Sequence, residues 1–456
     1  MSSALTEFLP GIMFLSLIAG LFTALPVPIV LAAITLIFAF IALALGEMRF
    51  VHISLIPTRI YGGMIDNAVL VAAPMFIFMG VVMEKTRIAE DLLLTLQKLL
   101  ARVPGGLALA VVLMGTILAA ATGIIGASVV MLTVMALPTM VRAGYSAPLA
   151  TGTIASAGTL GILIPPSVML VFMSDLLSLN LAKVFVAAFL PGLFLAGVYL
   201  VYLFARSLLR PGETPPAEPL SAEEKSGLLR EALISVSVPL ILIVAVLGSI
   251  IGGLASPTEA SGVGAFAALL LGFLRGRLSW KVLGDSTDNS LRTIALLFFI
   301  FAAATAFSYV FRKIGGDDFI IELARGLNLG DWALLFMMML MVFIMGFFFD
   351  WIEITLILLP IFAPIVGLMD LGAHVAKADL VYWFTILVAV NLQTSFLTPP
   401  FGFALFYMKG AAGSLVSMGD IYRGIVPFVL LQVAVLIVLI WQPEIALWLP
   451  NKLLSP

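Results

Sequence analysis

The sequence predicts an all-α polytopic membrane protein made of two inverted structural repeats. Each repeat is predicted to contain a re-entrant helical hairpin and a helix broken by a Pro-Pro pair. Of the 456 residues, 62% are hydrophobic and only 11% are charged, whereas a soluble domain is about half apolar and about a quarter charged. Long apolar runs alternate with short polar stretches, and several short motifs recur in the same order in both halves of the chain.

The composition excludes several classes of protein. The chain has no cysteine, which rules out disulfides, thiolate metal sites and cysteine nucleophiles. Its two histidines, His52 and His374, are unclustered and fall in stretches that we expect to be loops. The net charge of −2 gives no basic footprint for nucleic acid. With neither a P-loop nor a Ser/His/Asp arrangement, no catalytic residue is predicted, and no metal other than a coupling ion.

A membrane-spanning helix needs about 20 apolar residues. Runs of this kind are found at 10–25, 27–46, 67–84 and 184–205 in the first half, and at 236–254, 258–275, 292–311 and 424–449 in the second. A charged, amphipathic stretch follows the third run of each half. These stretches predict interfacial arm helices over 85–103 and 312–328, with Lys and Arg side chains that reach toward water.

Two further pairs of apolar runs are too closely spaced for ordinary spans. TGIIGAS interrupts the segment 106–141, and FFDWIEIT interrupts 332–368. Each pair predicts a hairpin that turns inside the membrane, which is tolerated only where protein or water covers the non-helical backbone. After each hairpin, Pro-Pro pairs interrupt the apolar segments 148–178 and 380–409. The polar stretch 206–235 predicts an aqueous linker between the halves.

An internal repeat is indicated by matches in a fixed order. One such match could arise by chance in an apolar chain, but several in order favour repeats over 1–205 and 236–456. The matches are FIF at 76–78 with FIF at 299–301, Pro138 with Pro360, Ser128 with Asp350, and Pro165-Pro166 with Pro399-Pro400.

The distribution of Lys and Arg predicts the orientation. Threading the predicted spans puts 15 of these residues on the side of the linker and 8 on the other. The linker is therefore expected in the cytoplasm, with both termini in the periplasm. Because the two hairpins then open to opposite sides, the repeats are predicted to be inverted.

Inverted repeats with broken helices are typical of secondary transporters, in which unwound carbonyls bind Na⁺ and helix N-termini bind anionic groups. A double proline interrupts a helix because it removes backbone donors and clashes with the preceding turn. The sequence therefore predicts two Na⁺ sites and a break region that contacts the substrate. Predicted site one is Thr122, Gly123, Gly126, Ala127, Ser128, Gly158, Thr159 and Gly161. Predicted site two is Asp350, Glu353, Thr355, Gln393, Thr394, Ser395 and Thr398. The break region is Pro165, Pro166, Ser167, Pro399 and Pro400.

Other interpretations of these residues stay open. A Pro-Pro pair can mark a simple kink or the edge of a loop. The glycines can instead be small packing residues that let helices approach. Glu353 can lie at the mouth of the hairpin facing water, whereas an acid within an apolar zone, such as Asp350, indicates a functional site.

The motifs TGIIGAS, ASAGTLGILIPPS, ASPTEASG, FFFDWIEITLILLPI and NLQTSFLTPPFGFALF resemble the large membrane (DctM-like) subunit of tripartite ATP-independent periplasmic (TRAP) transporters. The resemblance covers essentially the whole chain. It implies an elevator-type fold with a scaffold domain and a mobile transport domain, in the bacterial inner membrane. It also implies uptake of an organic acid driven by Na⁺, a small four-helix membrane subunit on a separate polypeptide, and a soluble periplasmic substrate-binding protein.

One departure from the family pattern affects site one. The family commonly has a Ser-Gly-Ser run at the first tip, where this chain has Gly-Ile-Ile-Gly-Ala-Ser. Backbone carbonyls are therefore the expected ligands there. The Asp350-Trp351 pair resembles a branch that includes carriers of 2-oxo acids, so a 2-oxo or other carboxylic acid is the expected substrate.

Three rival functions stay open at this point. A stand-alone ion-coupled anion transporter of related fold would need no binding protein. A structural or assembly subunit would show no ion cycle of its own. A membrane-embedded enzyme is disfavoured, because the intramembrane acids have no base or metal partner.

Overall fold

The computed structural model of the chain describes residues 6–23, 25–122, 125–215, 227–326, 329–399 and 402–454. Within these ranges every regular element is a helix, which confirms the predicted all-α fold class. Nine of the described helices are long and apolar enough to cross a membrane. Many large apolar side chains on α3, α14 and α22 are exposed, as expected for helices that face lipid.

The first half of the chain begins with two apolar helices and a segment of short helices. These elements are α2 (Leu9–Leu21), α3 (Val27–Ala44), α4 (Phe50–Ser54), α5 (Ile56–Ile60), the π-helical η1 (Tyr61–Ile65) and the 3₁₀ turn η2 (Ala68–Val71). The remaining elements are α6 (Ala72–Lys85), α7 (Ile88–Leu99), α8 (Gly106–Thr122), α9 (Ile125–Arg142), α10 (Ala147–Thr159), η3 (Leu160–Ile162), α11 (Val168–Leu176) and α12 (Leu181–Leu209).

The 3₁₀ turn η4 (Pro211–Glu213) follows α12. The second half has a similar order of elements: a long helix, a short amphipathic helix, a helix pair and an interrupted helix. Its elements are α14 (Leu228–Ile251), α15 (Pro257–Leu274), α16 (Trp280–Lys313), α17 (Gly316–Gly326), α18 (Asp331–Met345), α19 (Trp351–Leu368), α20 (Lys377–Phe396), α21 (Phe403–Ala412), α22 (Met418–Trp441) and α23 (Glu444–Leu453).

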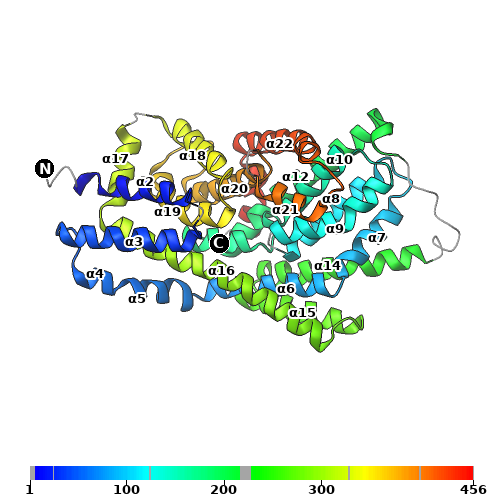
Figure 1. The fold of residues 1–456 in the computed structure, drawn as a ribbon, viewed down its shortest axis with the longest axis horizontal. Coiled ribbons are helices and arrows are strands. Elements are labelled where there is room, and N and C mark those ends of the chain that lie inside the picture. The colour runs from blue at the N-terminus through cyan, green and yellow to red at the C-terminus, as the bar shows by residue number, and fades with distance from the viewer. Residues whose placement is uncertain are drawn as a thin grey trace.

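The helices pack into two groups, seen as lower and upper layers in Figure 1. What we call the α16 group consists of α3, α5, α6, α7, α14, α15 and α16. What we call the α10 group consists of α8 to α12 and α18 to α23. The groups meet where α6 and α7 pack on α8 and where α16 packs on α19, so each hairpin has one helix against the α16 group.

The two short amphipathic helices lie at opposite ends of the molecule. Figure 1 shows α17 at the left end and α7 at the right, with α6 leading to α7 and α16 leading to α17. Because α6 and α16 pack together, these two helices, which carry the repeated FIF motif, run in opposite directions along the same contact.

Several expected boundaries differ from the structure. The C-terminal helix expected over 424–449 is two helices, α22 and α23, because Pro443 between them lacks a backbone donor. Helices also extend into both ends of the expected linker 206–235, of which 216–226 lie outside the described residues. The segment 50–65, which we did not predict to be helical, contains α4, α5 and η1, so His52 is helical rather than in a loop.

Candidate functional site

The two interrupted helices lie in the interior of the α10 group. α10 is buried on every side from Leu149 to Thr159, and α20 from Trp383 to Phe396. A helix enclosed by protein can carry polar residues and end in non-helical backbone without exposing either to lipid. Both Pro-Pro pairs come directly after these buried segments, where polar backbone groups are tolerated.

At the first break, a nearby side chain forms hydrogen bonds with two of the freed backbone groups. Pro165 and Pro166 are buried, and Ser167 is the N-cap residue of α11. The Ser167 hydroxyl donates to the carbonyl of Ile162 and accepts from the N–H of Leu170 at 3.4 Å. One carbonyl and one N–H freed by the break are therefore already paired within the chain.

The described residues of the second break include no side-chain cap for the helix that follows. The Thr398 hydroxyl donates to the carbonyl of Thr394 at 2.7 Å, and Pro399 is exposed. Gly402 is the N-cap of α21 and supplies no side-chain cap. No side chain of the described residues caps the start of α21, so the positive end of its dipole is available to an anion. Pro400 lies outside the described residues.

The first hairpin tip lies against α21. A Cβ atom added to Gly126 would come within 3.1 Å of the Tyr407 ring. Ser128 is buried, whereas Ala127 is exposed. Thr122 lies in the last turn of α8, and its side chain, like Gly123, is outside the described part of the chain.

Three predicted residues of site one lie at the end of α10 and in the η3 turn that follows it. A Cβ atom on Gly158 would come within 2.6 Å of the Val129 side chain, so this glycine allows α9 and α10 to pack closely. The Thr159 hydroxyl donates to the carbonyl of Ser156 at 3.0 Å. Gly161 lies in the buried η3 turn.

The second hairpin tip is organised by a pair of acids. Asp350 is the N-cap of α19, and its Oδ1 accepts from the N–H of Trp351 at 2.7 Å. Glu353 Oε2 accepts from the N–H of Asp350 at 2.6 Å, which completes a capping box. Each carboxylate has a second oxygen, so the cap and a cation ligand are compatible roles. Tyr407 lies within electrostatic range of both acids, so α21 is close to this tip.

The second tip also contacts α20 and α11. A Cβ atom on Gly346 would come within 2.1 Å of the Ser395 side chain, so only glycine fits where α18 ends. The Trp351 ring lies 6.1 Å, centroid to centroid, from the ring of Phe172 on α11. The half-helix after the first break and the tip of the second hairpin are therefore in direct contact.

Two hydroxyl groups of predicted site two keep their lone pairs available. Thr394 donates to the carbonyl of Val390 at 3.5 Å, and Ser395 donates to the carbonyl of Asn391 at 3.1 Å. Since each proton is directed into the helix backbone, the oxygen lone pairs are left to accept from another group or to coordinate a cation.

Among the residues that the structure describes, several buried polar atoms of α10, α19 and α20 have no hydrogen-bond partner. Both amide atoms of Gln393 and the hydroxyl of Thr355 are unpaired, and both side chains are fully buried. The Ser156 and Thr153 hydroxyls on α10 are unpaired as well. Unpaired buried polar groups are uncommon, because each loses its hydration without compensation. The unpaired groups on α19 and α20 are therefore candidate ligands for a bound polar species.

The donor set fits a hard monovalent cation. It consists of amide and hydroxyl oxygens with two carboxylates, and unwound carbonyls of broken helices also bind Na⁺ in transporters. Among the described residues, no group of three or more His, Cys, Asp or Glu side chains could hold a metal ion. The neutral candidate ligands on α19 and α20 are the oxygens of Thr355, Gln393, Thr394 and Ser395.

Sequence reasoning missed Tyr407 and Ser156. Tyr407 lies on the half-helix after the second Pro-Pro pair, where its position against the first tip depends on the fold. A signal for Tyr407 was present, because a tyrosine hydroxyl in an apolar segment needs a polar environment. Ser156 lies within the motif ASAGTLGILIPPS but is not among the residues predicted for site one.

Comparisons with known proteins agree over most of the chain. The family "Tripartite ATP-independent periplasmic transporter, DctM component" matches residues 14–445. The C4-dicarboxylate TRAP transporter large permease protein DctM of Pseudomonas aeruginosa is 32% identical over 394 residues, covering 85% of this chain and 87% of that protein. The ectoine/5-hydroxyectoine TRAP transporter large permease protein UehC of Ruegeria pomeroyi is 30% identical, covering 86% and 88%.

Two further similarities concern a longer relative and a solved structure. The isethionate TRAP transporter permease protein DctMQ of Oleidesulfovibrio alaskensis is 30% identical over 84% of this chain, but only 58% of that longer protein is matched. The crystal structure of the YdaH transporter of Alcanivorax borkumensis has a TM-score of 0.62 at 13% identity, covering 89% of each chain. At this identity the structural match shows a shared fold.

Proposed function

Because the chain belongs to the DctM component family of TRAP transporters, we propose that it imports a small organic acid by coupling its movement to a Na⁺ gradient. In this proposal a periplasmic substrate-binding protein delivers the acid, and a small four-helix membrane subunit completes the complex. The chain lies in the bacterial inner membrane, with the linker in the cytoplasm and both termini in the periplasm.

The arrangement of the two helix groups supports an elevator mechanism. The opposed directions of α6 and α16, and the placement of α7 and α17 at opposite ends, are what inverted repeats would produce. The α10 group contains both hairpins and both broken helices, so it is the proposed transport domain. The α16 group is the proposed scaffold, against which the α10 group slides with its bound cargo.

One observation carries the ion-coupling proposal. Among the described residues, the buried polar atoms of Gln393 on α20 and Thr355 on α19 have no hydrogen-bond partner, and α19 begins at the tip that holds two carboxylates. A Na⁺ ion here would coordinate these oxygens and offset the charge of the acids. The second proposed ion site lies at the first tip and η3, where the backbone and Ser128 supply the oxygens.

The substrate class is proposed from chemistry common to the relatives. Their names refer to C4-dicarboxylates, ectoine compounds and isethionate, all of which contain a carboxylate or a sulfonate. In this chain, the uncapped N-terminus of α21 offers N–H donors and a positive dipole end to such a group. We propose that it binds the acidic group of the cargo, a 2-oxo or other carboxylic acid.

Uptake into proteoliposomes tests this proposal. The chain would be reconstituted with its small subunit, and a substrate-binding protein loaded with radiolabelled acid would be added with or without an inward Na⁺ gradient. We expect uptake to need both Na⁺ and the binding protein. Uptake with Na⁺ alone would favour a stand-alone carrier, and uptake independent of any cation gradient would contradict ion coupling.

A further inference from the structure

A cavity of about 830 Å³ lies between the two helix groups, toward the end of the molecule where α17 lies. The α16 group contributes α5, η1 and the C-terminal part of α16 to its wall. The α10 group contributes Asp175 and Leu176 at the end of α11, and Leu356 and Pro360 on α19. Both contributions from the α10 group come from helices that take part in the candidate ion and substrate site.

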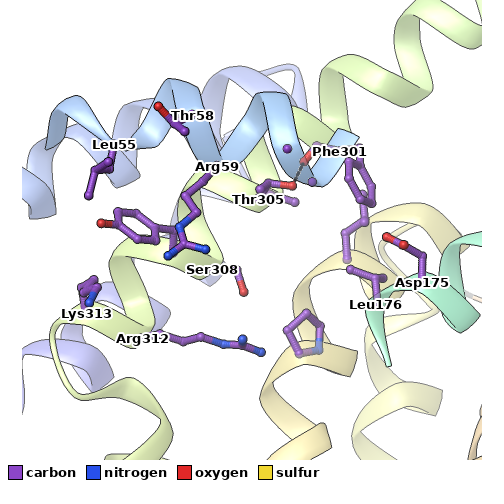
Figure 2. A pocket seen from close by; sticks show the side chains of 16 residues that line it. Leu55, Thr58, Arg59, Asp175, Leu176, Phe301, Thr305, Ser308, Arg312 and Lys313 are labelled. Carbon is purple, nitrogen blue, oxygen red and sulfur yellow. Dashed lines mark hydrogen bonds between the residues drawn. The ribbon is translucent and has the colours of Figure 1, made fainter. Parts of the chain in front are cut away.

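Positive charge predominates around this cavity. Arg59, Arg312 and Lys313 line it, against the single acid Asp175. Figure 2 shows Arg59 and Arg312 directed into the cavity from α5 and α16. The Asp175 carboxylate is already engaged, because its Oδ1 accepts from Asn67 Nδ2 at 2.5 Å.

The cations are largely without acidic partners. The Arg59 guanidinium lies 5.6 Å from the centroid of the Tyr309 ring. Arg312 Nε is 3.7 Å from Asp317 Oδ1, a loose contact between half-exposed side chains. In the part of the chain that the structure describes, neither Arg59 nor Lys313 has a carboxylate within ion-pair distance. Apart from its contact with the Tyr309 ring, the Arg59 guanidinium is thus available to an external anion.

The rest of the lining suits a small organic anion. Thr58, Thr305 and Ser308 supply hydroxyl groups on the side of the cations. Leu176, Phe301 and Leu356 supply apolar surface on the side of α11, α16 and α19. An acid with a short carbon skeleton needs both kinds of surface, and arginine pairs well with carboxylate and sulfonate oxygens.

We propose that this cavity is an antechamber that binds the carboxylate or sulfonate of the cargo through Arg59 and Arg312 before it reaches the broken helices. The proposal rests on the proposed transport of organic acids and adds a second, earlier anion site outside the ion cluster. In the proposed orientation the cavity is on the periplasmic side, where a released anion arrives. A cationic cleft raises the local concentration of such anions and their rate of entry.

The test uses the natural absence of cysteine in the chain. The variant Ser308→Cys, with a single cysteine, would be reconstituted in nanodiscs. It would be labelled with two thiol-reactive thiosulfonates, one carrying an anionic sulfonate group and the other a cationic ammonium group. We expect the ratio of the two rates, corrected for their rates with free thiol, to favour the anionic reagent by about tenfold. Thr58→Cys, on the rim of the cavity, serves as a second reporter if Ser308→Cys does not fold.

Two comparisons make the result specific. Arg59→Gln with Arg312→Gln should abolish the preference for the anionic reagent. Arg49→Gln removes an exposed cation from the start of α4, outside the cavity. This control variant should leave the preference for the anionic reagent unchanged. Millimolar succinate or isethionate, but not uncharged ethylene glycol, should slow labelling by the anionic reagent.

The experiment needs neither Na⁺ nor transport, so its outcome is separate from that of the proposed function. An unchanged rate ratio in the double Gln variant would overturn the antechamber. Protection by the substrate-binding protein but by neither small anion would also overturn it, and would assign these cations to protein docking. If the antechamber exists, the double variant should also raise the KM for uptake while leaving the Na⁺ dependence of uptake unchanged.

Discussion

The two helix breaks of the α10 group differ in whether a side chain caps the helix that follows. The first is buried, and Ser167 caps the helix that follows it. The second has an exposed Pro399 and an uncapped Gly402, and it lies near a hairpin tip that holds Asp350 and Glu353. Both have the same sequence pattern, yet only the second combines negative charge with free helix donors.

The difference leads us to expect separate tasks for the two hairpin tips. In the proposed mechanism, the neutral first tip would hold its cation mainly through backbone oxygens. A tip with acids can bind its cation more strongly and respond to its loss. We therefore expect substitutions at the second tip to change coupling more than matched substitutions at the first.

The largest effect is expected for Asp350→Asn. Asparagine caps a helix as well as aspartate does, so α19 should stay folded while the cluster loses a charge. Because an interaction with a charged group contributes about 1.5–3 kcal/mol, the Na⁺ concentration for half-maximal uptake should rise roughly 10- to 100-fold. Uptake titrated with Na⁺ measures this shift.

Asp331→Asn is the matched control for this prediction. Asp331 begins the other helix of the same hairpin, and its Oδ2 accepts from the N–H of Asp370 at 2.8 Å. This variant should keep the Na⁺ dependence of the wild type. Wild-type coupling in Asp350→Asn would remove Asp350 from the proposed site.

The next effect compares two amides on α20. Gln393→Leu removes unpaired buried atoms, so the protein should be as stable as the wild type or more stable, since an unsatisfied amide costs about 1–3 kcal/mol. Na⁺-driven uptake should nevertheless fall about tenfold. Asn391→Leu should lower the thermal unfolding temperature in detergent, because Asn391 Nδ2 donates to the carbonyl of Met339 at 2.6 Å. If Gln393→Leu is both less stable and fully active, Gln393 is a packing residue.

The sequence predicted the helical membrane fold and the family, and both are confirmed. Apolar run length determines where a span can lie, and Pro-Pro pairs determine where a helix must stop. It did not predict the helices of the segment 50–65, whose mixed residues carry no clear periodicity. The second tip was predicted as a pair of ion ligands, although Asp350-x-x-Glu353 is also the pattern of a capping box.

Contacts between distant parts of the chain could not be predicted in the same way. Tyr407 meets Gly126, and Phe172 meets Trp351, only after the two repeats have packed together. The cationic cavity is a further case, since Arg59 and Arg312 come from different repeats. A single sequence gives the residue types of such a cluster but not the packing of the helices that assembles it.

A smaller effect is expected at the first break. Ser167→Ala should destabilise the protein by about 1 kcal/mol, because it removes an N-cap and leaves the carbonyl of Ile162 without its partner. We expect a lower thermal unfolding temperature in detergent with little change in Na⁺ dependence. A large loss of coupling with no loss of stability would show instead that the Ser167 hydroxyl binds the ion or the cargo.

The smallest effect is expected for Ser128→Ala at the first tip. In the predicted repeat, Ser128 is equivalent to Asp350 but carries no charge, and the sequence TGIIGAS around it has few polar side chains. Its removal should change the half-maximal Na⁺ concentration by only a few-fold, since a neutral hydrogen bond contributes about 1 kcal/mol. The same Na⁺ titration of uptake, run beside Asp350→Asn, measures the ratio of the two effects. If Ser128→Ala equals or exceeds Asp350→Asn, the first tip binds the ion that drives transport, and the division of tasks between the repeats is reversed.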